Sequence, residues 1–366
     1  MDRGFVASLV VLVIFGLFML LSASGPFGYQ RFHDAGYFFK HQLVYGLLPG
    51  TILFIIFSRL DYRRLIPLAP AALVASVVML LMVYLPGIGM RFGGSGRWVY
   101  LGFLSFQPSE FVKICVLIYT AAWLEKRSVE SKTLDKGFLP FLLPLSLIVL
   151  LLILQPNTGS MFVIVASVLT AYYISGAPFI WFAGLGAVGT ALFVLLLKLS
   201  PYRAARFLTF LHPELDPDGI GYQINQAYLA IGSGGLLGLG YGHSRQKYLY
   251  LPEAYGDSIF AVMAEELGFI VCLAFLGLMS YLVWRCWSIA KNAYDPFGRY
   301  LAVGIGAWIA VQTLLNIASM LGLMPMTGVT LPFVSYGSSA FVALSIACGI
   351  MASISRGTKI WRARLP

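Results

Sequence analysis

Ten long apolar stretches constrain this chain more than any other feature of its sequence. Helices of about 20 apolar residues are long enough to cross the ~30 Å hydrocarbon core of a bilayer. The stretches lie approximately at 5–23, 41–58, 65–84, 107–124, 139–155, 159–175, 178–198, 258–284, 300–321 and 338–355. We therefore predict an all-α polytopic membrane protein with ten transmembrane helices, forming a single domain over residues 1–366.

The overall composition supports a membrane protein over a soluble one. The chain is 59% hydrophobic and only 11% charged, whereas a soluble domain is nearer half apolar and a quarter charged. The apolar stretches are continuous, so the alternating pattern of a transmembrane β-barrel is not indicated. The first stretch lacks a clear cleavage pattern, and we interpret it as a retained helix.

The distribution of basic residues predicts the topology. An even number of spans places both termini on one side. With the N-terminus inside, the inside segments hold 15 of the 25 basic residues but only six of the 15 acids. Basic loops stay in the cytoplasm, so we expect cytoplasmic N- and C-termini. The formal charge of +10 is then a topology signal, and no nucleic-acid partner is expected.

Three outside segments are long enough to carry function. They are 86–109, the large loop 199–257 between the seventh and eighth spans, and 322–337. Unusual loop residues on a helical scaffold often carry binding or catalysis. We expect the chemistry on this face. Within the large loop, 202–211 has the basic and apolar mixture of a helix lying in the membrane interface.

The stretch LPEAYGDSIFAVMAEELGFI, residues 251–270, contains the acids of greatest interest. Asp257 lies at the edge of an apolar run, and Glu265 and Glu266 lie ~12–14 Å further along the predicted helix. An acid inside a membrane span indicates function by default. The alternative for Asp257 is a helix N-cap. For Glu265 and Glu266, the alternative is pairing with a buried basic residue.

Charged residues elsewhere could bind an anionic group. Glu110 and Lys113 are three residues apart and share a helix face; they form either a structural bridge or a polar wall in a water-filled cavity. Arg97 lies just upstream. Arg245 and Lys247 in the large loop are candidates for a phosphate or diphosphate partner, with a solvated basic loop as the alternative.

Several motifs in the chain are familiar. They are GRWVYLGFLSFQPSEFVK, LQPNTGSMF, DPDGIGYQINQAYLAIGSGGLLGLG, SRQKYLYLPEAYGDSIFAVMAEELGF and GLMPMTGVTLPFVSYGSSA. In this order, and over nearly the whole chain, they resemble the SEDS family of bacterial cell-wall proteins. The PGIG after the third span and the SRQK before LPEA are more similar to the FtsW/SpoVE branch than to the RodA branch.

The resemblance implies a ten-helix peptidoglycan glycosyltransferase in the bacterial inner (cytoplasmic) membrane, at the division septum or other sites of wall synthesis. Such enzymes polymerise lipid II on the outer face, usually with a class b penicillin-binding protein that cross-links the product. The family's essential acid maps onto Asp257, and its polar pair onto Glu110 and Lys113. The chain departs from the usual residues at Gly256, Ser258 and Ser338, which puts the local geometry in question.

The expected mechanism is a single displacement. A sugar hydroxyl attacks the anomeric carbon of a lipid-linked chain, Asp257 is the general base, and undecaprenyl diphosphate leaves. Lys113, Arg97, Arg245 and Lys247 are candidates to bind the leaving group. The resemblance is compatible with a divalent Mg²⁺ or Mn²⁺ cofactor, whose ligands the sequence does not identify. The alternatives are a lipid II flippase and an inactive scaffold for a transpeptidase.

Overall fold

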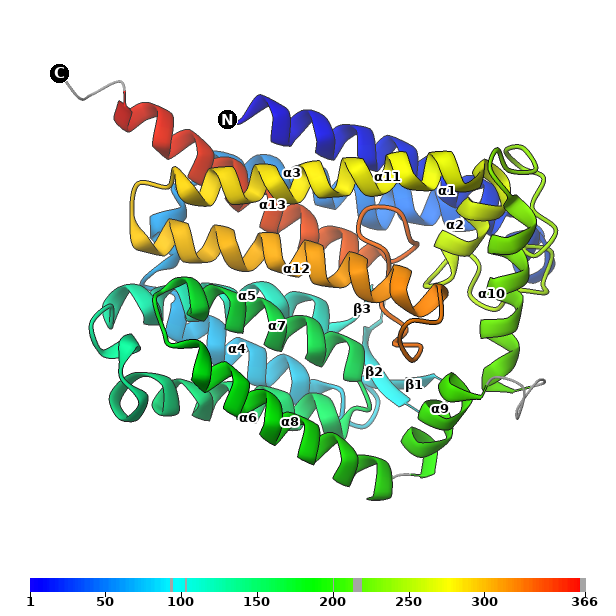
Figure 1. Ribbon diagram of the computed structural model, residues 1–366. Coiled ribbons are helices and arrows are strands. Elements are labelled where there is room, and N and C mark those ends of the chain that lie inside the picture. Colours follow the sequence, from blue (N-terminus) through cyan, green and yellow to red (C-terminus); the bar gives the residue numbers. More distant parts are fainter. Residues whose placement is uncertain (93–94, 103, 200, 213–218, 363–366) are drawn as a thin grey trace.

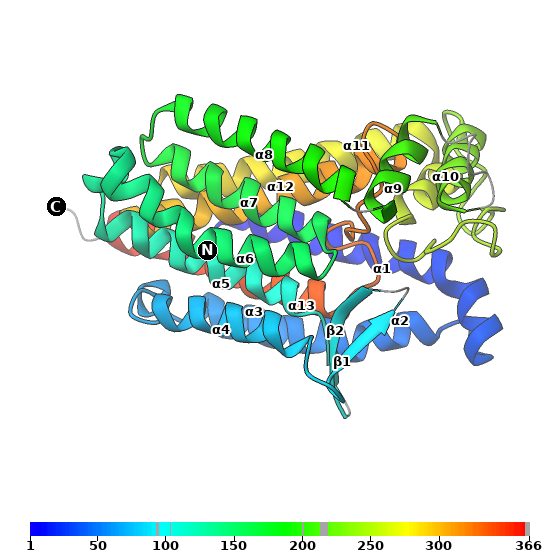
Figure 2. The ribbon, with the colours of Figure 1, turned by 90° about the horizontal axis from the view of Figure 1, so that it is seen from below.

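All ten predicted stretches are helical in the computed structural model, which describes residues 1–92, 95–102, 104–199, 201–212 and 219–362. The long helices run side by side in one bundle (Figures 1 and 2). They are α1 (Arg3–Phe32), α2 (Tyr37–His41) continued through a π-helical turn (Gln42–Leu47) into α3 (Leu48–Arg59), α4 (Ala69–Met82), α5 (Pro108–Lys126), α6 (Leu139–Leu154), α7 (Thr158–Ile174), α8 (Phe179–Leu199), α11 (Ile259–Lys291), α12 (Pro296–Met320) and α13 (Ser338–Arg362).

Seven helical segments in the described part of the chain are long and apolar enough to cross a membrane. Helices α4 and α7 are apolar but shorter, with 14 and 17 residues. Helix α5 has 19 residues and carries Glu110 and Lys113 inside it. The protein is therefore a mostly helical, multi-pass membrane protein. The count of ten spans and the cytoplasmic termini stay predictions.

Local sequence explains where several helices begin. Asp2 accepts a hydrogen bond from the Phe5 N–H at 2.9 Å and caps α1. Asp295 does the same for α12, from the Gly298 N–H at 2.7 Å. Such side chains satisfy backbone donors that have no partner within the helix. Pro108 and Pro296 occupy first turns, where a missing N–H costs nothing.

Both termini lie at one end of the bundle, together with the α11–α12 connection (Figure 1). Arg285 forms an ion pair with Asp2, and Asp2 N–H donates to Ser355 Oγ at 3.0 Å. At the same end, Arg63 Nε contacts Asp295 at 3.0 Å. The antiparallel strands and the 235–258 segment lie at the opposite end (Figure 1). An even number of membrane crossings would place both termini at one end of the bundle, as seen here.

The outside segment 86–109 contains a small sheet that the sequence analysis did not predict. Strands β1 (Gly89–Phe92), β2 (Ser95–Leu101) and β3 (Leu104–Phe106) form an antiparallel sheet in that order. The strands are held by pairing between neighbouring segments, which a hydropathy pattern does not reveal. The all-α description is therefore incomplete.

The large segment 199–257 is partly helical. Helix α9 (Pro201–Leu211) occupies the stretch predicted as an interfacial helix, and α10 (Ile220–Gly234) follows. Helix α10 lies across the end of the bundle and packs on α11 (Figure 1). Residues 213–218 of this loop lie outside the described part of the chain.

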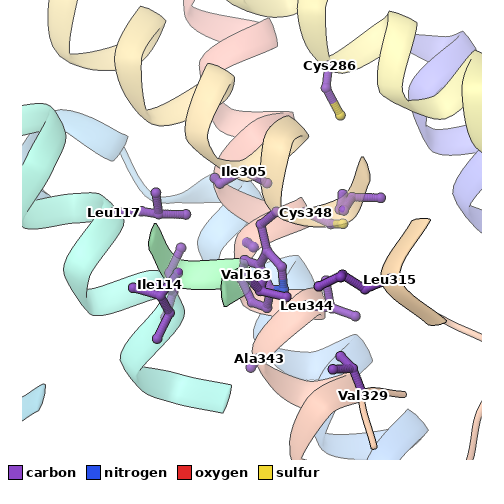
Figure 3. Close-up of a cluster of buried hydrophobic side chains, with 14 of the residues drawn as sticks. Ile114, Leu117, Val163, Cys286, Ile305, Leu315, Val329, Ala343, Leu344 and Cys348 are labelled. Atoms are coloured by element: carbon purple, nitrogen blue, oxygen red, sulfur yellow. The ribbon is translucent and has the colours of Figure 1, made fainter. Parts of the chain in front are cut away.

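The core lies where α5, α7, α12 and α13 converge. Figure 3 shows buried side chains from these helices, among them Leu117, Val163, Ile305 and Leu344, gathered together with Val329 from the last outside segment. Trp308 of α12 is fully buried there. The residues before and after Val329 are thereby held against the bundle, which positions the site described below.

Helix α11 is interrupted at Gly268, where the backbone adopts φ 74° and ψ −179°. The interruption leaves helical hydrogen-bonding groups without their usual partners, and residues 234–240 supply replacements. The N–H groups of Leu239 and Gly240 donate to the carbonyls of Glu265 and Glu266, each at 2.9 Å. The Phe269 N–H donates to the Gly235 carbonyl at 2.9 Å. Residues 234–240 and the interrupted part of α11 therefore satisfy each other's backbone hydrogen bonds.

Replacing Gly268 by alanine is expected to lower the free energy of unfolding by about 2 kcal/mol or more. A Cβ would meet the Gly238 nitrogen at 2.3 Å, and left-handed backbone costs a non-glycine residue roughly 1–2 kcal/mol. The control is Gly277→Ala in the same helix, where nothing lies within 4 Å of the added atom. Thermal unfolding of the purified protein compares them. Equal midpoints would show that the interruption is not needed.

Candidate active site

Asp257 is partly exposed and lies two residues before α11, a helix that begins at the end of the bundle away from the termini (Figure 1). Gln223 of α10 donates from Nε2 to Asp257 Oδ1 at 3.3 Å and to Ser258 Oγ at 3.0 Å. Ser258 Oγ also lies 3.5 Å from Asp257 Oδ1. One carboxylate oxygen thus faces two polar side chains, so its orientation is set by α10 and by its own neighbour.

The N-cap alternative for Asp257 stays a prediction. Ser258 is the residue that precedes α11, and no side chain at that position caps the helix. The Asp257 carboxylate lies one residue further from the helix, where Gln223 and Ser258 contact it.

Gly328 lies on the other side of the carboxylate. A Cβ built on Gly328 would be 3.7 Å from Asp257 Oδ2, and the backbone there has φ 68°. Left-handed backbone of this kind favours glycine. The segment 322–337 therefore approaches Asp257 with backbone that carries no side chain at Gly328.

Asn316 of α12 fastens these two segments together. Its side chain is 1% exposed, and Nδ2 donates to the Asp257 carbonyl at 2.7 Å and to the Val329 carbonyl at 2.8 Å. Its Oδ1 is buried and accepts no hydrogen bond among the described residues. Such an orphaned acceptor is costly, and it lies in the residue that holds the Asp257 backbone.

The sequence analysis missed Gln223 and Asn316. A signal was available for Asn316, since Gln312 and Asn316 are polar residues four apart in the apolar stretch 300–321 and so share one helix face. Gln223 gave no comparable signal because its role depends on α10 folding back over the start of α11.

Glu110 and Lys113 form the ion pair that their spacing predicts. Lys113 Nζ lies 2.7 and 2.9 Å from the two carboxylate oxygens of Glu110. The same ammonium donates to Gln312 Oε1 at 2.8 Å and lies 5.3 Å from the centre of the Trp308 ring. Both members are at most 4% exposed. These contacts correspond to the structural bridge, and the predicted wall of a water-filled cavity is not what surrounds the pair.

The buried pair is connected to the last outside segment. Gln312 Nε2 donates to the Thr330 carbonyl at 2.9 Å, while Asn316, one turn further along α12, holds Val329. Two amides on one face of α12 therefore fix residues 329–330, and with them the backbone beside Asp257. The charges of Glu110 and Lys113 are satisfied inside the bundle, from where they support this backbone indirectly, and their role in substrate binding stays a prediction.

Glu265 and Glu266 hold the glycine-rich part of the large loop against the bundle. Glu265 accepts from Ser244 Oγ at 2.5 Å, from the Arg245 N–H at 2.9 Å and from the Gln246 N–H at 3.3 Å. Glu265 is 1% exposed and Glu266 is fully buried. Both acids are thus engaged inside the bundle, Glu265 by a hydroxyl and two backbone N–H groups.

Lys247 is the basic partner of Glu266. Its Nζ lies 2.7 Å from Glu266 Oε1 and also donates to Ser22 Oγ at 2.9 Å and to the Gly242 carbonyl at 2.8 Å. Lys247 is 5% exposed. Its donors are used within a buried network that links α1, the loop and α11, and its contact with an anionic substrate group stays a prediction.

The two remaining basic candidates lie on the same end of the molecule. The Arg245 side chain is exposed, while its backbone is held by Glu265. Arg97, in β2, is partly exposed and donates from Nη2 to the Pro156 carbonyl at 2.5 Å. Of the four predicted anion-binding residues, Arg97, Lys113, Arg245 and Lys247, Arg245 is the one that is exposed. For both residues, contact with a substrate stays a prediction.

Fold and site together define a class: a multi-pass helical membrane protein with a partly exposed carboxylate at one end of its bundle, held by two inter-span segments. Comparison with known proteins identifies the family. The profile of the FtsW/RodA/SpoVE family, described as "Cell cycle protein", matches residues 3–360. The chain belongs to the FtsW/RodA/SpoVE family.

The relatives agree with the branch predicted from the motifs. The chain is 39% identical over 359 residues to the probable peptidoglycan glycosyltransferase FtsW of Trichlorobacter lovleyi, covering 98% of this chain and 94% of that protein. It is 38% identical over 347 residues to the stage V sporulation protein E of Bacillus subtilis, covering 95% of this chain and 94% of that protein.

Solved structures show the same fold. One chain comes from a study of how a peptidoglycan synthase complex coordinates polymerization and crosslinking. It superposes with a TM-score of 0.82 at 28% identity, covering 98% of both chains. The rod shape determining protein RodA of Thermus thermophilus superposes with a TM-score of 0.71 at 28% identity, covering 97% of this chain and 96% of that one.

Proposed function

We propose that this protein is a peptidoglycan glycosyltransferase that polymerises lipid II into glycan strands. Family membership and the names of the relatives support the reaction class. The observation that carries the assignment of the site is the environment of Asp257. Glu110, Glu265 and Glu266 are enclosed and engaged by donors, whereas Asp257 keeps partial exposure between two outside segments.

In the proposed reaction, Asp257 accepts the proton of the attacking sugar hydroxyl. The hydroxyl oxygen forms the new bond to the anomeric carbon of the lipid-linked chain, and the bond to undecaprenyl diphosphate breaks. A carboxylate held within hydrogen-bond reach of the proton is the geometric requirement for such a base. Gln223 and Ser258 orient Oδ1, and Gly328 brings backbone without a side chain close to Oδ2.

We propose ten transmembrane spans, cytoplasmic termini and Asp257 on the outer face. The protein then acts in the bacterial inner (cytoplasmic) membrane, at the septum or other sites of wall synthesis. The proposed partner is a class b penicillin-binding protein. A similar fold found in a peptidoglycan synthase complex supports an assembly of this kind.

We propose a Mg²⁺ or Mn²⁺ ion as a partner of the substrate diphosphate at this site. Mg²⁺ is usually held by one or two carboxylates together with phosphates and water. Asp257 offers a carboxylate, and the unpartnered Oδ1 of Asn316 is an oxygen of a type that such ions accept. Among the described residues, no group of three or more His, Cys, Asp or Glu side chains is placed to hold a metal alone. The ion would neutralise the leaving diphosphate.

The flippase and inactive-scaffold alternatives are less well supported. Glu110, Lys113, Glu265 and Glu266, expected to line a headgroup pathway, are used in buried contacts. The departure at Ser258 forms part of the site, since its hydroxyl contacts both Gln223 and Asp257. A Thr side chain at Gly256 would chiefly meet the Glu253 carboxylate, 2.9 Å from an added Cβ.

The test is polymerisation of lipid II by the purified full-length protein with its transpeptidase partner, with and without a chelator. We expect glycan strands to form, chelation to abolish them, and added Mg²⁺ or Mn²⁺ to restore them. Headgroup exposure in proteoliposomes is measured in parallel. Transbilayer movement of lipid II without polymer would contradict the enzyme and support the flippase.

Replacing Gln223 by methionine is expected to lower the polymerisation rate by about tenfold. Hydrogen bonds to charged groups contribute roughly 1.5–3 kcal/mol, and Gln223 is the α10 side chain that orients Asp257 Oδ1. The thermal unfolding midpoint serves as the control and should change little, because Gln223 is only partly buried. An unchanged rate in a folded variant would remove Gln223 from the site.

A further inference from the structure

Residues 234–240, which we name the leucine turn, carry an unusual set of exposed apolar side chains. Leu236, Leu237 and Leu239 are 67%, 79% and 41% exposed. The turn is closed by a hydrogen bond from the Gly238 N–H to the Gly234 carbonyl at 2.8 Å. Exposed apolar clusters mark contact surfaces. These leucines can meet lipid, water or another protein.

The position of the leucine turn along α11 places it at hydrocarbon depth. Helix α11 has 33 residues, or ~50 Å, more than the ~30 Å hydrocarbon core. Near its C-terminal end, Trp284 and Trp287 are 54% and 50% exposed, and tryptophans of this kind mark the membrane interface. Ile270, which donates to the Leu236 carbonyl at 3.2 Å, lies ~21 Å from Trp284 along the axis. That is ~9 Å inside the opposite boundary.

The backbone of the leucine turn is suited to such a depth. Irregular backbone survives in hydrocarbon only where its polar groups have partners. The turn exchanges four hydrogen bonds with the interrupted part of α11, two in each direction, at 2.9–3.2 Å. The close approach requires glycine, because a Cβ on Gly238 would meet the Glu266 carbonyl oxygen at 2.2 Å.

The leucine turn also continues an exposed apolar surface of α11. Phe269, Ile270 and Leu273 are 59%, 54% and 57% exposed, and the first two are hydrogen-bonded to the turn itself. We propose that the leucine turn is inserted into the bilayer leaflet on the Asp257 side, where its leucines contact lipid acyl chains.

Insertion would anchor the loop that leads to Asp257. Four residues beyond the turn, at Ser244, the loop enters the contacts of Ser244 and Lys247 with Glu265 and Glu266. The loop is thereby fixed on one side by lipid and on the other by buried acids. This anchoring concerns the protein and its membrane alone, so it can fail or hold independently of the glycosyltransferase activity.

The test is electron paramagnetic resonance of the full-length protein in phosphatidylcholine–phosphatidylglycerol nanodiscs. A nitroxide is attached at Leu237→Cys after Cys115→Ala, because Cys115 is the partly exposed native thiol and the other three are buried. Relaxation by oxygen, which enters lipid, is compared with relaxation by a water-soluble nickel chelate. Leu273→Cys is the lipid reference, and Val129→Cys, 80% exposed in a charged turn, is the aqueous reference.

We expect the label at Leu237 to match the Leu273 reference, with high accessibility to oxygen and low accessibility to the nickel chelate. Nickel accessibility near that of Val129 would place the leucine turn in water and overturn the proposal. Exclusion of both reagents would show that protein covers it, which also overturns the proposal. A second label at Leu236→Cys guards against a local effect of one substitution.

Discussion

Asp257→Asn is expected to reduce the rate of lipid II polymerisation by about 10²–10⁴-fold, the usual contribution of a positioned general base. Asparagine has the same shape, and the contacts with Gln223 and Ser258 involve only the side chain at Oδ1. The backbone contact with Asn316 is unaffected, because it uses the Asp257 carbonyl. The loss should therefore be chemical rather than structural. The measurement is the initial rate of polymer formation with the transpeptidase partner present.

The matched control for Asp257 is Asp34→Asn. Asp34 lies just after α1, where Lys40 and the Gly36 N–H donate to its carboxylate at 2.9 Å each and lower its pKa. It is an acid at the same end of the bundle, outside the site, and its loss should leave the rate unchanged. Full polymer yield from a folded Asp257→Asn protein would show that another group removes the proton.

Lys113→Met is expected to lower the free energy of unfolding by about 3–5 kcal/mol. Removal of one member of a buried ion pair leaves the other charge without compensation. Glu110 would keep a carboxylate at 4% exposure with its ammonium partner gone. The measurement is thermal or detergent-induced unfolding of the purified protein.

Two further variants make the Lys113 prediction specific. The double variant Glu110→Gln with Lys113→Met carries no unpaired charge and should recover much of the lost stability. Lys40→Met removes the exposed ion pair with Asp34, whose side chains are 67% and 40% exposed. That change should cost at most about 1 kcal/mol. If the buried and exposed changes had equal effects, the buried pair would have no special structural role.

Many residues of the site could be predicted from the sequence, but which of them are buried and which stay exposed could not. Asp257 was identified because it is an acid at the edge of an apolar run, and the structure leaves it partly exposed there. Glu110 and Lys113 were expected to meet because residues three apart share a helix face, and they do. Their burial was not predictable, since the residues that enclose them, such as Trp308 and Gln312, come from α12, about 200 positions away.

The same limit explains Lys247. Its position in a basic loop favoured binding of an anionic substrate group. The neighbouring residues in the sequence do not indicate that its side chain contacts Ser22 and Glu266. The Ser22–Glu266 hydrogen bond, at 2.7 Å, spans 244 positions in the chain. These residues meet because α1 packs against α11, and the spacing of residues along the sequence does not reveal that packing.

The sequence by itself determined that this chain forms membrane helices. A continuous apolar stretch of this length can satisfy its backbone hydrogen bonds in hydrocarbon by forming a helix. The sequence also determined which residues carry charge near these helices. Only the tertiary structure decided which charges are available. Glu110, Lys113, Lys247, Glu265 and Glu266 are engaged by partners from distant segments. Burying a charge is tolerable only when it is paired, whereas Asp257 keeps partial exposure at the end of the bundle, as the proposed base requires.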